Sequence, residues 1–421
     1  NGSKNTGVGK DALTALTSGV GNTSLGFEAG EDVTTGGYNI AIGYRAAYRL
    51  TTGGSNLAIG MTALSAANMS GGSNIALLDS LWSLVDGNYN IAIGKNALAR
   101  ITTGNENVAI GYESQYWNGH VANGTQNTTI GGRAGRYTYG NANTFMGSNA
   151  GSGNNSLKSP GVQNVGVGTY SLYSYISASY NVAIGYNALY NNQYGEYNVA
   201  IGQGAGDHAT GSNNTFVGSQ AGEGGTTSAP YSSGGSNTAI GYQALKGFTT
   251  GYQNIAVGYQ AGLAITTGQR NIAIGTQALQ QNTTSHGNIA IGYRTLYNAV
   301  NASSYQIAIG DGALYNHSGS ADDYALAIGF EAGYNSQTDI GAVMIGYRAG
   351  YRSSGFSGVY IGSQAGLKST NSGIYIGRDA GAGAENYSGG NIAIGYLSGT
   401  VFMSTSDNNV FVGQQAGRYA T

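Results

Sequence analysis

The sequence predicts an all-β fold, a parallel β-solenoid, and two observations lead to that class. A five-residue box recurs along the whole chain, with asparagine first, alanine between two aliphatic or β-branched residues, and a closing glycine. Two copies are Asn39, Ile40, Ala41, Ile42 and Gly43, and Asn271, Ile272, Ala273, Ile274 and Gly275. About 24 copies follow at a commonest step of about 17 residues. We expect each copy to form one coil of two short strands and two turns, since the unit is too short for a helix pair or a propeller blade.

The composition agrees with this fold class. The residues of the box favour pleated strands, and the 74 glycines of the chain, with its many asparagines, suit tight turns. A continuous repeat predicts one domain over residues 1–421, with longer links near 112–126, 151–163 and 222–236. The segment 77–84, rich in leucine, is the best candidate for a local exception to the repeat.

Alternation along a strand predicts which side chains lie inside the coil. Ile40 and Ile42 share one face and Ala41 takes the other. We expect the isoleucines to point inward, with Ile40 near Leu57 and Ile42 near Ile59 of the next coil. The alanines then form an outer stripe that is small and apolar, which favours close contact with other chains in a homotrimer. The alternative is a monomer whose alanine face is covered by its own turn.

The asparagine that opens each box predicts one of two structural roles. Its amide can donate to the next coil and accept from the previous one, as an asparagine ladder. It can also hold a turn within its own coil. The sequence leaves both roles open.

The boxes resemble the head repeats of YadA-type trimeric autotransporter adhesins, and similar repeats occur in phage and viral tail fibres. The stretches closest to that pattern are 107–111 (Asn-Val-Ala-Ile-Gly) and 181–188. The resemblance implies a left-handed parallel β-roll in an intertwined trimer. The unit here is longer than the adhesin unit, so we expect a larger outer turn, and no coiled-coil stalk or anchoring barrel is recognised in these residues.

Charge and residue types exclude several classes of function. Charged residues make up 9% of the chain and the net charge is −2, which gives no basic surface for nucleic acid or anionic membranes. No apolar run approaches the ~20 residues of a membrane helix, and the absence of cysteine excludes disulfides and thiolate metal sites. Histidines and carboxylates are scattered. We therefore predict no enzyme, no cofactor and no metal site.

Candidate ligand contacts lie in the long links and in a row of tyrosines. Loops on a rigid scaffold often carry binding residues, which selects Trp117, His120 and Tyr231, although a link can also be an insertion without a role. Tyrosine follows many box glycines, as at Tyr242 and Tyr259. These rings either face a sugar or pack along the coil edge and between chains.

These observations predict an extracellular structural fibre or adhesin, a trimeric shaft that presents loops to a cell surface or glycan. Its location would be a cell surface, a secreted filament or a virion tail fibre. One alternative is a filament of solenoids stacked end to end, favoured by terminal coils without a polar cap. Another is an ice-binding solenoid, suggested by threonine pairs such as Thr34-Thr35, although adjacent side chains point to opposite faces of a strand.

Overall fold

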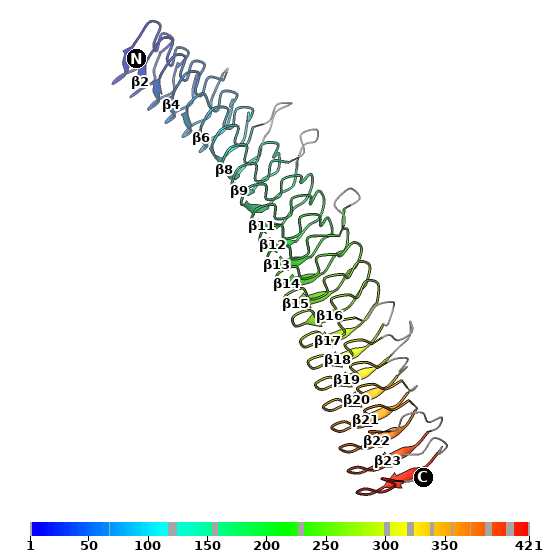
Figure 1. Cartoon of the computed structure of the whole chain (residues 1–421). Helices are drawn as coiled ribbons and strands as arrows, with labels where there is room; N and C mark the ends of the chain where they lie inside the picture. The colour runs from blue at the N-terminus through cyan, green and yellow to red at the C-terminus, as the bar shows by residue number, and fades with distance from the viewer. Residues whose placement is uncertain are drawn as a thin grey trace. The chain divides into compact units, whose positions relative to one another are not determined.

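The computed structural model describes residues 2–66, 68–116, 124–153, 159–225, 231–298, 304–317, 324–336, 341–354, 357–370, 372–383, 390–400 and 408–419. The chain divides into two compact units, Asn1–Thr210 and Gly211–Thr421. Each unit is a parallel β-solenoid whose successive coils stack with their strands in one row (Figure 1). No helix occurs in the described residues, so the predicted fold class is confirmed.

Every strand is three residues long and is the middle of one box. Those of unit 1 are β1 Thr6–Val8, β2 Thr23–Leu25, β3 Ile40–Ile42, β4 Leu57–Ile59, β5 Ile75–Leu77, β6 Ile91–Ile93, β7 Val108–Ile110, β8 Thr128–Ile130, β9 Thr144–Met146, β10 Val165–Val167, β11 Val182–Ile184 and β12 Val199–Ile201. Those of unit 2 are β13 Thr215–Val217, β14 Thr238–Ile240, β15 Ile255–Val257, β16 Ile272–Ile274, β17 Ile289–Ile291, β18 Ile307–Ile309, β19 Leu326–Ile328, β20 Val343–Ile345, β21 Val359–Ile361, β22 Ile374–Ile376, β23 Ile392–Ile394 and β24 Val410–Val412.

Neighbouring strands pair in parallel and in register. Ile40 pairs with Leu57 and Ile42 with Ile59, which confirms the predicted neighbours. The expectation of two strands per coil is wrong for the described residues, because each coil has one named strand. Left-handed backbone at two turn positions, as at Arg45 (φ 55°) and Ala47 (φ 50°), interrupts any second extended segment. The turns nevertheless stack through backbone hydrogen bonds between coils, such as Ala47 N to Ala63 O at 2.9 Å.

The predicted alternation is correct, but its assignment to inside and outside is wrong. Ala41 is buried, whereas Ile40 is 41% exposed and Ile42 is half-buried. The lumen is too narrow for two columns of isoleucine. A Cβ atom added to Gly262, across the coil of β15, would lie 3.6 Å from Ala256 Cβ. The alanines therefore fill the inside of the coil, and they cannot form the predicted contact with other chains.

The turn supplies the second part of the core. The fourth residue after the box glycine also points into the lumen, where Leu64, Leu98 and Leu189 are fully buried. In unit 1, Leu64, Leu98 and the strand alanines from Ala41 to Ala109 belong to one continuous apolar cluster that begins near Ala29. One coil has too little apolar surface to form a core alone, so stability comes from stacking on its neighbours.

The asparagines form a ladder and also hold the turns. Asn39 donates its backbone N–H and its Nδ2–H to Asn22 Oδ1 at 2.9 and 3.0 Å. The same Nδ2 donates to Gly53 O at 2.9 Å. Both predicted roles are thus combined in one amide, with the ladder running opposite to the expected direction, since each asparagine donates to the previous coil.

The box at 74–78, which has Leu78 in place of glycine, remains a regular coil. From Leu77 to the next inward turn residue, Leu81, the chain takes one residue fewer than in the preceding coil, from Ile59 to Leu64. Leu78 has a φ of 61°, compared with 127° for Gly60. The shorter turn therefore removes the conformation that requires glycine. The expected local exception at 77–84 is limited to this change.

Candidate interaction surfaces

The outer face of the strands is an exposed aliphatic surface. The third residue of every strand is aliphatic or methionine, and the first is aliphatic or threonine. Ile184, Ile240 and Ile274 are 38, 40 and 37% exposed. None of these positions carries a charge in either unit, although strands on a solvated face normally do. This surface, which we call the aliphatic face, has the character of a contact site.

Two rows of aromatic rings follow the turns. The residue after the box glycine forms the first row, in which Tyr242 and Tyr259 are exposed and stack at 5.5 Å between ring centroids. The fifth residue after the glycine forms the second row, in which Tyr297, Tyr315, Tyr334 and Tyr351 stack at 5.1, 4.7 and 5.3 Å. The packing role predicted for tyrosine is therefore present within the chain.

The other predicted contact residues are not brought together. Trp117 and His120 lie outside the described residues. Tyr231 is half-buried at the end of the third long link. Ligand binding by Tyr231, Tyr242 and Tyr259 stays a prediction.

The histidines within the described residues lie in different coils. His286 Nδ1 accepts the Gln269 N–H at 3.1 Å, and His317, which is buried, bonds Ser336 Oγ at 2.8 Å. In the described part of the chain, no group of three or more histidine, aspartate or glutamate side chains is placed to hold a metal ion.

The threonine pairs are part of the scaffold. The first threonine of a pair donates its hydroxyl to a carbonyl of the next coil, as Thr34 Oγ1 does to Thr51 O at 3.1 Å. Thr249 and Thr266 repeat this bond at 3.1 and 3.0 Å. The first hydroxyl of these pairs is thus engaged within the solenoid.

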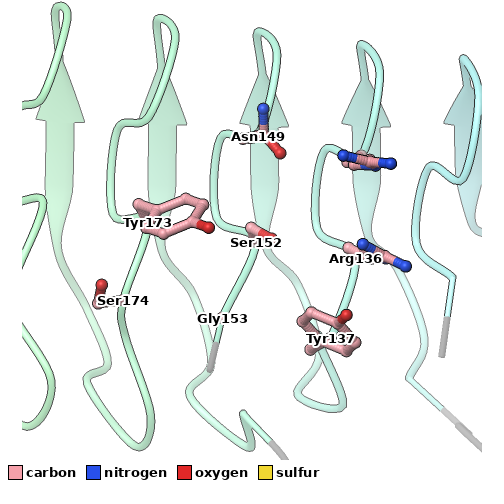
Figure 2. Close-up of a pocket in the computed structure, with 8 residues that line it drawn as sticks. Arg136, Tyr137, Asn149, Ser152, Gly153, Tyr173 and Ser174 are labelled. Carbon is pink, nitrogen blue, oxygen red and sulfur yellow. The ribbon is translucent and has the colours of Figure 1, made fainter. Parts of the chain in front are cut away.

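A hollow of about 320 Å³ opens on the turn surface of unit 1, and we call it the notch. Three successive coils, those of β8, β9 and β10, contribute its lining: Arg133, Arg136, Tyr137, Asn149, Ser152, Gly153, Tyr173 and Ser174. Figure 2 shows Ser152 on the middle coil, with Arg136 on one side and Tyr173 on the other. These three occupy the fifth position after the box glycine, so the notch marks an interruption in the second aromatic row.

Two arginine side chains beside the notch pair with one carboxylate. Glu113, in the coil of β7, accepts from Arg133 Nε and from Arg136 Nη2, both at 3.2 Å. Two guanidinium groups against one carboxylate leave one excess positive charge. The Arg136 Nε is buried and has no hydrogen-bond partner in the described residues.

Large aromatic side chains fill the lumen of the coils that carry the notch. Phe145 fills the lumen of the middle coil, and Gly151 gives it room, since a Cβ there would lie 2.3 Å from the ring. Tyr175 packs against Phe145 at 5.6 Å and bonds Thr138 Oγ1 at 2.6 Å. Burial raises the pKa of Tyr175 and of Tyr137 above the usual tyrosine value, so both rings are neutral near pH 7.

Sequence reasoning missed the notch, although a signal was present. Aligning the copies at the box glycine places Ser152 in a position that is tyrosine in the next two coils, at Tyr173 and Tyr190. A small residue inside an aromatic row predicts a gap in the surface. Unit 2 has a smaller hollow of about 160 Å³ at a gap in the first row, where Asp311 takes the place of an aromatic residue.

Comparison with known proteins adds no family to this description. No family model matches the chain, and neither does any curated protein. No helix in the described residues is both long and apolar enough to cross a membrane.

Proposed function

We propose that this protein is a structural fibre subunit that assembles with copies of itself through the aliphatic face. The observation that carries the proposal is the exposure of an uncharged aliphatic column along both units. Water contact with so many aliphatic side chains is unfavourable, at about 25 cal/mol for each Å² of apolar surface. Burying this face against another chain would recover that free energy.

A second copy of this chain is the partner that fits the face best. The strands repeat at about 4.8 Å, so a partner must present matching apolar ridges at the same spacing over a long distance. This chain itself carries such a surface. Homo-oligomers with closed symmetry are the common outcome when a surface complements itself.

The size of the face supports a stable interface. Twelve coils at about 4.8 Å and a strand width of about 10 Å give a flat area on the order of 600 Å² for each unit. This area is close to the ~800 Å² that each partner buries in a typical specific interface. The largest apolar patch on an ordinary monomer is about 300–600 Å².

The assembly we propose is a homotrimer, with three aliphatic faces turned toward a common axis. The resemblance to trimeric adhesin heads and tail fibres supports that number, and it also supports an extracellular role in which the fibre spans distance and presents turns and links for attachment. The isoleucine and valine columns, and not the buried alanines, would form the contacts of this trimer. Ice binding is disfavoured because the first hydroxyls of the threonine pairs bond the next coil.

The mass in solution tests this proposal. We expect light scattering to give three times the 42.8 kDa of the chain. A variant with Ile184→Lys, Ile240→Lys and Ile274→Lys should be monomeric and keep the circular dichroism spectrum of the parent. Thr35→Lys, Thr250→Lys and Thr267→Lys, three exposed positions away from the strands, should leave the mass unchanged. A monomeric parent, or a lysine-face variant that still assembles, would refute the proposal.

A further inference from the structure

We infer that the notch of unit 1 binds one pyranose ring of an acidic glycan, a sugar that carries a carboxylate or a sulfate. The site is separate from the aliphatic face, so it neither requires nor excludes assembly. Its residues come from three stacked coils, and two of them, Ser152 and Gly153, lie at the start of the long link near 151–163.

The width of the notch suits one inserted pyranose ring. Arg136 and Tyr173 lie on coils two steps apart, about 9.6 Å at the usual strand spacing. Elsewhere in the same row one step separates stacked rings, as between Tyr173 and Tyr190 at 5.0 Å. The missing aromatic at Ser152 therefore leaves room for one inserted ring. The volume of about 320 Å³ is at the lower end of the roughly 300–1,000 Å³ found for ligand pockets.

Tyr173 provides the apolar wall. Tyr190 stacks on one side of its ring at an interplanar angle of 16°, and Tyr170 meets it edge-on at 5.3 Å. These contacts hold the ring in place while it lines the notch. A pyranose has a face of C–H groups that packs on an aromatic ring and an edge of hydroxyls that stays polar.

The opposite wall selects for negative charge. Arg136 and Arg133 outnumber the Glu113 carboxylate, and the Arg136 Nε–H has no partner in the described residues. Guanidinium groups bind carboxylate and sulfate oxygens through charge-assisted hydrogen bonds. Asn149, Ser152 and Ser174 add amide and hydroxyl groups that suit sugar hydroxyls. An isolated inorganic anion would leave the Tyr173 ring unused, and so few basic residues do not favour nucleic acid.

Titration calorimetry on the full chain tests the inference with three probes. These are a galacturonic acid trisaccharide, dextran sulfate, and the neutral galactose trisaccharide. We expect the acidic probes to bind and the neutral probe to bind at least tenfold more weakly. The tighter of the two acidic probes identifies carboxylate or sulfate as the preferred group. Binding of the neutral probe with equal affinity, or no binding of either acidic probe, would overturn the inference.

Variants locate the binding to the notch. Ser152→Tyr should continue the aromatic row, fill the notch and abolish binding, whereas Ser65→Tyr, at the same repeat position in the coil of β4, should not alter it. Tyr173→Ala should weaken binding about tenfold through loss of stacking. Arg136→Gln should weaken the acidic probes about tenfold to a hundredfold and leave the neutral probe unchanged. Parent-like affinity in Ser152→Tyr, with a parent-like circular dichroism spectrum, would place the site elsewhere.

Discussion

The coil of β11 in unit 1 and the coil of β21 in unit 2 have similar turn conformations but fill their lumens in opposite ways. In the first, the strand contributes the small Ala183 and the turn contributes Leu189. In the second, the strand contributes the large Tyr360 and the turn contributes Gly366. Leu189 and Gly366 have φ angles of 50° and 59°, so the turn conformation is conserved while the source of the side chain changes.

The difference extends to the asparagine ladder. Asn181 opens the box of β11 and is part of the ladder, but Gly358 stands at that position in the coil of β21. A Cβ atom on Gly358 would lie 2.2 Å from the Tyr360 hydroxyl. The tyrosine hydroxyl therefore occupies the space that an asparagine side chain uses in other coils. Phe145, which has no hydroxyl, coexists with Asn143 at the same point.

These two coils indicate that the volume inside a coil is fixed and that a few positions share it. Protein interiors are close-packed, so a larger residue at one position requires a smaller one opposite. The neighbouring coil of β22 repeats the arrangement with Gly373, Tyr375 and Gly381. Each coil thus has an internal constraint that can be broken by one substitution and restored by a second.

The largest expected effect comes from overfilling the coil of β21. In Gly366→Leu, the new Cβ would lie 2.4 Å from Tyr360 Cδ1. We expect a loss of about 3 kcal/mol or more in the free energy of unfolding. Urea unfolding monitored by circular dichroism measures it. The triple variant Gly358→Asn, Tyr360→Ala, Gly366→Leu rebuilds a coil of the β11 type and should recover most of the loss; failure to recover would show that the exchange is not local.

Emptying the coil of β11 is the converse change. Leu189→Gly removes a fully buried side chain, and we expect a loss of about 3 kcal/mol from the cavity. The double variant Ala183→Phe, Leu189→Gly copies the Phe145 and Gly151 arrangement and should be more stable than Leu189→Gly alone. A double variant less stable than the single one would contradict the shared-volume account. Thermal and urea unfolding provide the comparison.

Removing one rung of the ladder should have a somewhat smaller effect. Asn254 donates to Asn237 Oδ1 at 3.2 Å and to Gly268 O at 2.8 Å, and it accepts the Asn271 N–H at 3.0 Å. Asn254→Ala leaves these buried groups without partners, at a cost of about 2 kcal/mol.

The matched control for this rung is Gln253→Ala, since Gln253 is the preceding, exposed residue of the same coil. It should change the free energy of unfolding by less than about 0.5 kcal/mol. Hydrogen exchange of the Asn271 amide reports the local opening. Equal stabilities for the two variants would show that the ladder contributes nothing.

The smallest effect at neutral pH is expected at Tyr175, which fills the lumen from a third position. Tyr175→Phe loses the bond to Thr138 Oγ1, worth about 1 kcal/mol. Burial raises the pKa of Tyr175, so its folded state favours the neutral phenol. The contribution of Tyr175 to the free energy of unfolding is fully present below the ordinary tyrosine pKa of about 10, and it is lost as the pH rises above that value.

The Tyr175 variant should therefore become more stable relative to the parent between pH 9 and pH 11. Urea unfolding at several pH values measures this difference, with Tyr297→Phe as a control for a tyrosine in the outer row. A stability difference that does not vary with pH would contradict the inference that Tyr175 must stay neutral.

Much of the fold was predictable because the repeat is short and strict. The position of each strand, the parallel register of Ile40 with Leu57 and the stacking of asparagines all follow from copies spaced by nearly one coil. The notch was harder to predict from the sequence, because it depends on the absence of an aromatic residue at Ser152 rather than on a residue type that suggests binding. Its signal lies in the alignment of copies, not in any single copy.

Sequence alone determined the winding of this protein, since periodicity specifies how often the chain returns and alternation specifies that alanine and isoleucine lie on opposite faces. It did not determine which face is inside. The tertiary structure decided that point through the width of the lumen, where a Cβ atom added to Gly262 would already be in van der Waals contact with Ala256, so no room is left for isoleucine columns. Hydrophobicity favours burial of isoleucine, but close packing in a narrow coil admits the smaller residue and leaves the aliphatic face to be covered from outside.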